Sequence, residues 1–320
     1  MTSTPPPTPS PAAPVTKVLI AGATGLIGAE LSRVLVAAGV GVNALVRDTT
    51  RAASRLPAGV TLFPWDAVTG PPPAAAFAGV DGVVSLVGES IADRRWSDAR
   101  RKQLRDSRIV STRALVNEIR GLPTRPRVLV SGSAAGYYGD RGDEILTEAS
   151  AAGTGFLAEL ARDWEAEAMR ATELGLRVAV VRNGAVLARQ GGFLRKVLPV
   201  FRLGVGGRIG DGAQWFPWIH LDDAVALIRH ALDDDRAAGP LNAVAPEPVT
   251  NRELTSALGE VLSRPTVVTA PAFALRLALG GMADEMLLGS QRVMPVRTLE
   301  NGFQFRHPLL RAALKDLLDR

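Results

Sequence analysis

The stretch KVLIAGATGLIG, residues 17–28, decides the fold. A short apolar run at residues 18–21 leads into three evenly spaced glycines, Gly22, Gly25 and Gly28, and an apolar stripe of helical period follows them. In a strand, loop and helix of this kind, the glycines allow a tight turn, close approach of the backbone to a pyrophosphate, and close packing of the helix on the strand. The helix N-terminus then faces the phosphates. The flanking strand and helix favour this interpretation over a purely structural glycine turn, so the stretch predicts a dinucleotide-binding loop.

Short apolar segments alternate with segments of helical period as far as about residue 185. The apolar segments are rich in Val, Leu and Ile and mostly lack polar alternation, as expected for strands covered on both faces. They are residues 18–21, 42–46, 60–63, 82–87, 127–131 and 177–182. Such alternation predicts an α/β fold, a doubly wound parallel sheet of Rossmann type with strand order 3-2-1-4-5-6. The looser sequence that follows predicts a smaller, mostly helical C-terminal lobe.

The composition divides the chain into regions. Residues 1–16 contain six prolines among Ser, Thr and Ala, which predicts a disordered tail. Residues 17–185 are expected to form the NADP-binding domain, to which residues 216–245 return. Several glycine pairs interrupt residues 186–215, and loops of this length often carry binding surface. We therefore assign residues 186–215 and 246–320 to a substrate-side lobe.

Composition also narrows the class of protein. The 320 residues include no cysteine, which excludes disulfides, thiolate metal sites and cysteine nucleophiles. No apolar run reaches 18 residues and no signal-like segment opens the chain, so we expect a cytoplasmic protein without a membrane partner. The three histidines have no partners at metal-ligand spacing, and no metal site is predicted. The expected partner is a small-molecule substrate, and the oligomeric state is left open.

Eight basic residues gather between positions 94 and 113. A nucleic-acid site would combine a continuous positive surface with aromatic side chains for stacking. Here Asp93, Asp98 and Asp106 are interleaved, and Trp96 is the one aromatic residue of the segment. Because charge runs usually mark an exposed helix face, we predict a solvated helix surface and no nucleic-acid binding.

The residue after the second predicted strand indicates which dinucleotide binds. Many NAD-binding proteins place an acid there to bind the ribose hydroxyls, whereas this chain has Arg47. An arginine can bind the 2′-phosphate of NADP through charge-assisted, bidentate hydrogen bonds. The sequence therefore predicts NADP(H) as the cofactor. Asp48 offers a ribose acceptor if the register differs by one or two residues, which keeps NAD as the alternative.

The ordered combination of motifs resembles the extended and atypical short-chain dehydrogenase/reductases, in the branch similar to nucleoside-diphosphate-sugar epimerases with a C-terminal helical domain. The resemblance runs from Lys17 to about Leu318. It rests on GATGLIG at 22–28, LVGE at 86–89, RRW at 94–96, SR at 107–108, SGSAAGYYGD at 131–140, DWE at 163–165, RNG at 182–184, QWFPWIH at 214–220 and GFQF at 302–305.

This resemblance implies a set of cofactor contacts at the carboxyl ends of the strands. Asp66 is expected at the adenine, and Leu86 and Gly88 beside the ribose and nicotinamide. Ser131 and Ser133 follow the fifth strand, where a hydroxyl would point toward the nicotinamide and the substrate. The loop residues expected to touch the cofactor are Gly22, Thr24, Gly25, Leu26, Ile27 and Gly28.

The chain departs from the family pattern at the catalytic pair. The resemblance implies a Tyr-x-x-x-Lys pair on the helix after the fifth strand, but residues 156–165 read FLAELARDWE, and the two tyrosines of the chain, Tyr137 and Tyr138, lie upstream. Two alternatives follow. Tyr138 or Tyr137 supplies the proton, with Ser133 polarising a carbonyl and Arg162 replacing the lysine. Otherwise the usual chemistry has been lost.

We predict an NADP(H)-dependent oxidoreductase or epimerase-like enzyme with Ser133 and Tyr138 as catalytic residues, acting on a nucleotide sugar or a small carbonyl compound. The alternative is a catalytically impaired NADP(H)-binding sensor or interaction protein. The aromatic residues at positions 215, 216 and 218 are expected either in the substrate cleft or in the core. His220, at an expected helix start, is interpreted as a structural histidine bonded to the cap.

Overall fold

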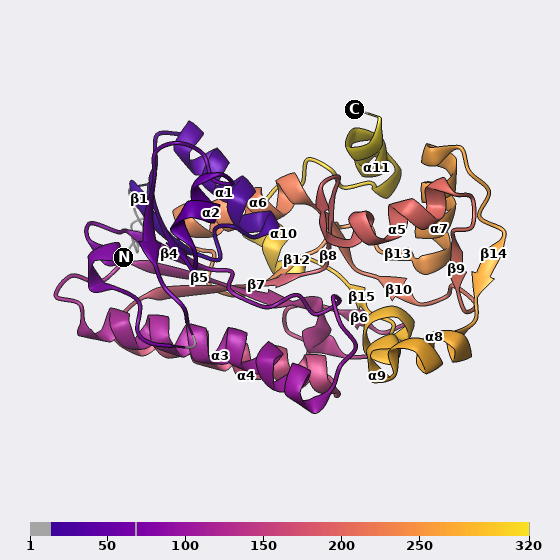
Figure 1. Ribbon diagram of the computed structural model, residues 1–320, viewed down its shortest axis with the longest axis horizontal. Helices are drawn as coiled ribbons and strands as arrows, with labels where there is room; N and C mark the ends of the chain where they lie inside the picture. The colour runs from indigo at the N-terminus through magenta and orange to yellow at the C-terminus, as the bar shows by residue number, and fades with distance from the viewer. Residues whose placement is uncertain (1–13, 68, 320) are drawn as a thin grey trace, which may run out of the picture.

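The structure is a computed structural model that describes residues 14–67 and 69–319. Its centre is a sheet of seven parallel strands in the order β12-β7-β5-β4-β1-β2-β3 (Figure 1). The strands are β1 (Lys17–Ala21), β2 (Gly41–Val46), β3 (Val60–Pro64), β4 (Gly82–Ser85), β5 (Val128–Ala134), β7 (Arg177–Asn183) and β12 (Gly239–Ala243). The predicted order of the first six is confirmed, and β12 adds a seventh strand, beside β7, that was not predicted.

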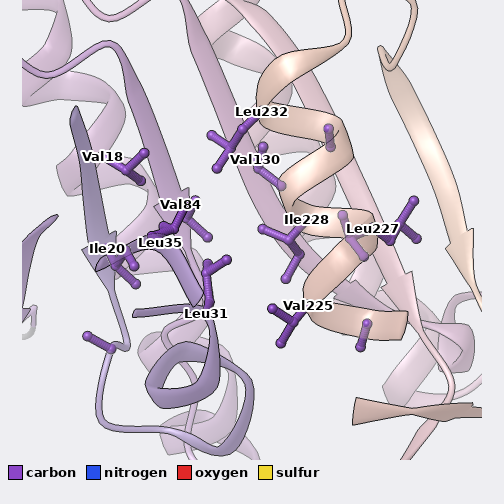
Figure 2. Packing of buried hydrophobic residues seen from close by; sticks show 14 of the residues in the cluster. Val18, Ile20, Leu31, Leu35, Val84, Val130, Val225, Leu227, Ile228 and Leu232 are labelled. Atoms are coloured by element: carbon purple, nitrogen blue, oxygen red, sulfur yellow. The ribbon is translucent and has the colours of Figure 1, made fainter. Parts of the chain in front are cut away.

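Helices cover both faces of this sheet, as the doubly wound fold requires. The alternating residues of β1 divide between the two layers, because successive side chains of a strand point to opposite faces. Val18 and Ile20 pack with α1 (Leu26–Ala37) and α6 (Leu221–Asp233), the layer shown in Figure 2. Leu19 and Ala21 pack with α3 (Asp98–Gly121) and α4 (Phe156–Met169). The near absence of polar residues in β1 follows from this double burial.

The remaining elements include a second group packed around its own core. This core contains Leu187, Leu198, Trp218, Leu258 and Leu314. The elements that supply this core are β8 (Ala185–Ala188), α5 (Gly192–Arg202), β10 (Trp215–Phe216), β11 (Trp218–His220), β13 (Val249–Thr250), α7 (Asn251–Leu262) and α11 (Leu310–Leu318). The same part of the chain also contains β9 (Gly207–Ile209), β14 (Val268–Ala270), α8 (Ala272–Leu279), α9 (Gly281–Ala283) and a π-helical turn η4 (Asp284–Leu288). A capping box starts α7, in which the Thr250 and Glu253 side chains each accept from the backbone of the other.

Short elements complete the chain. They are α2 (Thr49–Ala53), β6 (Ile145–Leu146), β15 (Arg292–Val293), α10 (Val296–Glu300), and the 3₁₀ turns η1 (Ala74–Phe77), η2 (Ala135–Tyr138) and η3 (Arg170–Leu174). None of the described helices is long and apolar enough to cross a membrane.

One carboxylate joins distant parts of the chain. Glu148 is 5% exposed and accepts hydrogen bonds from the backbone N–H of Asn242 in β12 at 3.1 Å, and from those of Arg297 and Thr298 in α10 at 3.1 and 3.2 Å. Three backbone donors to one carboxylate form a stable buried arrangement, because each bond is charge-assisted. The segment after β6, the edge strand and the C-terminal region therefore meet at Glu148.

The predicted disordered tail of residues 1–16 lies mostly outside the described residues, which begin at residue 14. Val15 is packed in the core, and the exposed Thr16 is held by hydrogen bonds. Val15 is 3% exposed and belongs to the core beside α6, and Thr16 donates its backbone N–H to Asp81 at 2.7 Å. The expected boundary is therefore corrected: the packed chain starts before Lys17.

Candidate functional site

The glycine loop leaves no space for side chains at two of its positions. Gly22 has φ +89°, and a Cβ there would lie 2.7 Å from the carbonyl carbon and oxygen of Leu86. A Cβ on Gly28 would lie 2.3 Å from the carbonyl oxygen of Gly22. Helix α1 begins after Gly25, and no described side chain caps it, so the N–H groups of its first turn are available to a ligand. These features fit the pyrophosphate of a dinucleotide.

A cluster of arginines lies beside this loop. Arg47 follows β2 with 76% of its side chain exposed. Together with Arg51, Arg55 and Thr24 it lines a pocket of about 410 Å³. Sequence reasoning found Arg47 and missed the other two, of which Arg51 lies in α2 and Arg55 lies two residues beyond its end. Three guanidinium groups in one pocket favour a phosphate as its occupant.

Asp48, the residue that kept NAD as an alternative, has a structural partner. Its carboxylate caps α2 by accepting the backbone N–H of Arg51 at 2.9 Å. Asx residues commonly cap helices in this way. The register places Arg47, rather than an acid, directly after the strand, which supports the reasoning for a 2′-phosphate.

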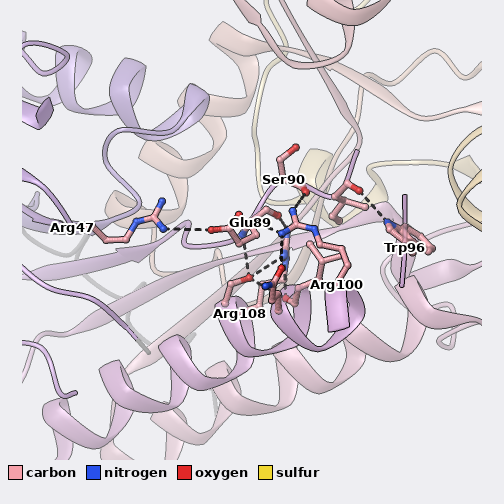
Figure 3. Close-up of polar contacts among 10 residues, drawn as sticks. Arg47, Glu89, Ser90, Trp96, Arg100 and Arg108 are labelled. Carbon is pink, nitrogen blue, oxygen red and sulfur yellow. Dashed lines mark hydrogen bonds and ion pairs between the residues drawn. The ribbon is translucent and has the colours of Figure 1, made fainter. Parts of the chain in front are cut away.

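The loop after β4 brings Glu89 across from Arg47 (Figure 3). The Glu89 Oε1 atom lies 3.4 Å from the Arg47 guanidinium, and its Oε2 atom lies 3.6 Å from that of Arg100. The same loop contains Leu86 and Gly88, and the N–H of Leu86 donates to the last residue of β1 at 2.8 Å. The glycine loop and the loop after β4 therefore lie side by side at the carboxyl ends of β1 and β4, and their contacts with a cofactor stay predictions.

Two arginines of the basic segment are buried, which corrects the prediction of a solvated helix face. Arg100 and Arg108 are each 8% exposed and lie under the loop after β4. Arg108 donates to the carbonyl of Glu89 at 2.9 Å, and Arg100 donates to the carbonyl of Ser90 at 2.6 Å. Burial lowers the pKa of Arg108 to about 10. These side chains support the loop. The pattern of charges in the sequence does not distinguish them from the exposed arginines beside them.

The other expected cofactor residues have different surroundings. Asp66 is exposed, two residues beyond the end of β3. Ser131 is fully buried within β5, and its hydroxyl donates to the carbonyl of Gly132 at 3.2 Å. The structure therefore places Asp66 at the surface and Ser131 inside the sheet, and their contacts with a cofactor stay predictions.

Ser133 and Tyr138 belong to one buried hydrogen-bond network. The Ser133 hydroxyl donates to Glu165 Oε1 at 2.6 Å, and Arg182 makes two bonds of 2.8 Å to the same carboxylate. Arg182 also donates to the Tyr138 hydroxyl at 3.0 Å, and that hydroxyl donates to Asn242 Oδ1 at 2.7 Å. The network connects β5, α4, β7 and β12.

Burial raises the pKa of the Tyr138 hydroxyl. Its side chain has no exposed surface, and this desolvation raises its pKa to about 12, although the Arg182 guanidinium opposes the shift. Ser133 is 4% exposed. Both hydroxyls have protein partners, and the catalytic role of the two residues stays a prediction. Arg162, considered as a substitute for the missing lysine, pairs instead with neighbouring Asp163 and is 59% exposed.

A cleft of about 210 Å³ opens beside the carboxyl ends of β5 and β7. Trp215 and Phe216 line it, whereas Trp218 is 1% exposed in the core, so the two expected roles are divided among these aromatic residues. The other lining residues are Ala135, Gly136, Leu157, Asn183, Gly184, Ala185, Phe193, Ile209, Gln214, Pro217, Asn251, Glu285, Met286, Leu287, Gly289 and Gln291. Most of the polar groups among them are amides. Sequence reasoning did not identify these polar residues, because they come from four separate segments.

His220 caps α6, as predicted for a structural histidine. Its Nδ1 atom accepts the backbone N–H of Asp222 at 3.1 Å. The His307 ring stacks on the His220 ring with centroids 3.8 Å apart, and a carboxylate oxygen of Asp316 in α11 lies 3.5 Å from the His220 Nε2 atom. Possible metal-ligand atoms of His220, His307 and Asp316 lie within 4.8 Å of one another. An imidazole binds metal in the plane of its ring, so the stacked geometry suits packing between α6 and α11 better than shared metal ligation.

Acid should destabilise the protein through this histidine. Burial, with the neighbouring His307 imidazole, lowers the pKa of His220 in the folded chain. The unfolded chain therefore binds more protons below a pH of about 6.5, and the free energy of unfolding falls as pH falls. We expect a smaller loss between about pH 7 and pH 5 in His220→Asn, because asparagine can still cap α6. Urea unfolding at both pH values measures this, and equal losses in the two proteins would contradict it.

The fold and the glycine loop define a class: a Rossmann-type dinucleotide-binding protein, here with a cleft at the strand ends. Comparison with known families makes this specific. Residues 18–244 match the NAD-dependent epimerase/dehydratase family, and residues 270–317 match a domain of unknown function, DUF1731. The chain therefore belongs to the NAD-dependent epimerase/dehydratase family, which confirms the resemblance inferred from its motifs.

Relatives match nearly the whole chain. An epimerase family protein of Mycobacterium bovis is 42% identical over 93% of this chain and 96% of its own length. The human epimerase family protein SDR39U1 is 36% identical over 94% of this chain and 99% of its own. A crystal structure of human SDR39U1 with NADPH superposes with a TM-score of 0.83 at 35% identity, covering 95% of this chain and 99% of that one.

Proposed function

We propose that the protein is an NADP(H)-dependent oxidoreductase of the short-chain dehydrogenase type that acts on a small molecule in the cleft beside β5 and β7. The observation that carries the proposal is the arginine pocket at Arg47, Arg51 and Arg55, which adjoins the uncapped N-terminus of α1. One end of the groove is thus suited to a 2′-phosphate and its centre to a pyrophosphate. The human relative crystallised with NADPH supports the same cofactor.

Each part of the groove has a task in this proposal. The loop of Gly22, Thr24, Gly25, Leu26, Ile27 and Gly28 holds the pyrophosphate, Asp66 lies near the adenine, and Leu86, Gly88 and Ser131 lie toward the ribose and nicotinamide. When bound, NADPH supplies a hydride. The protein positions the two reactants relative to each other. A cleft lined by segments that follow β5 and β7 is in the position where open α/β sheets bind substrates.

Arg47→Ala is expected to weaken NADPH binding about 10-fold to 100-fold and to leave NADH binding nearly unchanged. The variant removes charge-assisted hydrogen bonds that only the 2′-phosphate can accept. Titration of the nucleotide fluorescence measures both affinities. Arg120→Ala is the matched control, since Arg120 is a half-exposed arginine of α3 outside the groove. Unchanged NADPH affinity in the Arg47 variant would contradict the assignment of the cofactor.

A sensor that binds NADP(H) without turnover is the second candidate. Two observations favour it: α4 contains neither tyrosine nor lysine, and the hydroxyls of Ser133 and Tyr138 already have buried partners. Ser133→Ala and Tyr138→Phe separate the candidates when NADPH oxidation is measured against a panel of carbonyl compounds. Turnover that is lost in these variants while NADPH binding is kept supports the enzyme with these catalytic residues. Absence of turnover in the unaltered protein supports the sensor.

A further inference from the structure

The cleft has an unusual charge for a site that would hold a nucleotide sugar. Of its described lining residues, Glu285 carries the one charge, and none is arginine or lysine. Arg292 stacks behind Trp215, 4.5 Å from the ring centroid, but it lies outside the lining and faces Asp143 at 3.5 Å. A diphosphate buried in this cleft would therefore have no cation to pair with, which is costly in a site partly shielded from water.

The protein places its own carboxylate where an anion would otherwise bind. Glu285 Oε1 accepts the backbone N–H of Phe156 at 3.1 Å, and Oε2 accepts that of Leu157 at 2.7 Å. These are the first two residues of α4, whose N-terminus favours negative charge. Gly155 has φ +101°, and a Cβ there would lie 3.1 Å from Glu285 Oε2, so this glycine leaves room for the carboxylate. The N-terminus of α4 is thus already occupied by the protein's own carboxylate.

The other lining groups are amides and apolar side chains. Asn183 donates its Nδ2 hydrogens to the carbonyls of Ser133 and Val181 at 3.3 and 3.1 Å, and its buried Oδ1 has no hydrogen-bond partner among the described residues. Phe193 and Phe216 form an aromatic wall with centroids 4.8 Å apart. The volume of about 210 Å³ is below the range of about 300–1,000 Å³ that is common for drug-sized ligands.

Resting on the proposed function, we infer that the substrate is a small, uncharged carbonyl compound with an apolar body, and that Glu285 excludes anionic substrates, nucleotide sugars among them. In the reaction, the carbonyl carbon receives a hydride from NADPH and the carbonyl oxygen receives a proton from water, which yields the alcohol and NADP⁺. The amide groups bind polar atoms of the substrate, and the aromatic wall packs against its apolar part. Like charges held close together disfavour binding, so the carboxylate gives selectivity.

The test uses a matched pair of probes and one nucleotide sugar. Benzaldehyde and 4-carboxybenzaldehyde differ by a carboxylate, and UDP-glucose supplies a diphosphate. Saturation-transfer NMR on the NADP⁺-bound protein measures binding, and NADPH oxidation measures turnover of the two aldehydes. We expect the neutral aldehyde to bind at least about tenfold more tightly than the acid. Glu285→Gln should reduce this ratio of affinities severalfold, because the variant removes the negative charge that repels the acid. The amide oxygen can still accept one N–H of α4, so the contact with the helix is kept. Glu300→Gln, at an exposed position outside the cleft, should leave the ratio unchanged.

The outcomes separate this inference from the proposed function. Loss of NADPH binding in the unaltered protein would remove the proposed function itself. If NADPH binds, then tighter binding of UDP-glucose or of the acid, or equal or absent binding of the two aldehydes, overturns the inference and leaves the cofactor assignment standing. A ratio that Glu285→Gln does not change also overturns it. Thermal melting and NADPH titration of the Glu285 variant establish that it is folded.

Discussion

NADPH binding is expected to fall at least about 100-fold when Gly28 is replaced by alanine. The added Cβ would lie 2.3 Å from the carbonyl oxygen of Gly22 and 2.9 Å from the Cα of Ala23. Both atoms belong to the backbone of the loop, so the clash cannot be relieved by a side-chain rotation. The loop must move away from α1, and the N–H groups that face the pyrophosphate then lose their alignment.

Gly39→Ala provides the control for this variant. Gly39 ends α1 with φ +76°, but a Cβ there meets no described atom within 4 Å. Its replacement carries the backbone strain of a left-handed alanine, about 1–2 kcal/mol, without a steric clash. NADPH titration and thermal melting of both variants distinguish a local defect of the loop from general destabilisation. If Gly28→Ala binds NADPH as the unaltered protein does, the loop does not hold the pyrophosphate.

Arg182→Met is expected to lower the free energy of unfolding by about 3–5 kcal/mol. Arg182 is 3% exposed, and its loss leaves the Glu165 carboxylate buried beside Ser133 without its cation. Removing one member of a buried ion pair has this cost because the remaining charge is desolvated and uncompensated. The variant also removes a donor to the Tyr138 hydroxyl. Urea unfolding measures the change.

Two further variants make the result specific. The double variant Glu165→Leu with Arg182→Met removes both charges and should cost less than the sum of the single variants. Arg113→Met breaks an ion pair with Glu167, which also joins α3 to α4, but Arg113 is half-exposed. A surface pair contributes about 0–1 kcal/mol, so this variant should be nearly neutral. A loss below about 1 kcal/mol for Arg182→Met would mean that the pair does not stabilise the fold.

Much of the fold could be predicted because its signals are local. The six predicted strands and the loop at residues 22–28 each depend on a short stretch of sequence. The seventh strand, β12, was not predicted, because its sequence does not resemble that of a buried strand. It begins with Gly239 and Pro240 and contains the polar Asn242. Asn242 is tolerated there because its Oδ1 accepts from Tyr138 and its Nδ2 donates to Met294.

The candidate site was predictable where residue type and position coincide, and obscure where contacts are distant in sequence. Arg47 was identified because it follows a strand directly. Glu285 contacts Phe156 at the start of α4, which lies 129 residues away in the sequence, and no local sequence pattern indicates such a contact. The burial of Arg108 could not be predicted either, because the basic segment itself does not indicate that the loop after β4 covers this side chain. The pairing of Ser133 with Glu165 depends on how β5 and α4 pack.

The contacts of Glu148 bear on how the protein is made. Its carboxylate is satisfied by β12 and by backbone groups 149 and 150 residues further along the chain. During synthesis from the N-terminus, the strands of the central sheet therefore leave the ribosome before α10, which supplies two of the donors to Glu148. A nascent chain that stops short of α10 contains this carboxylate without two of its donors. This buried carboxylate is therefore fully satisfied only after α10 has been synthesised and has packed against β12.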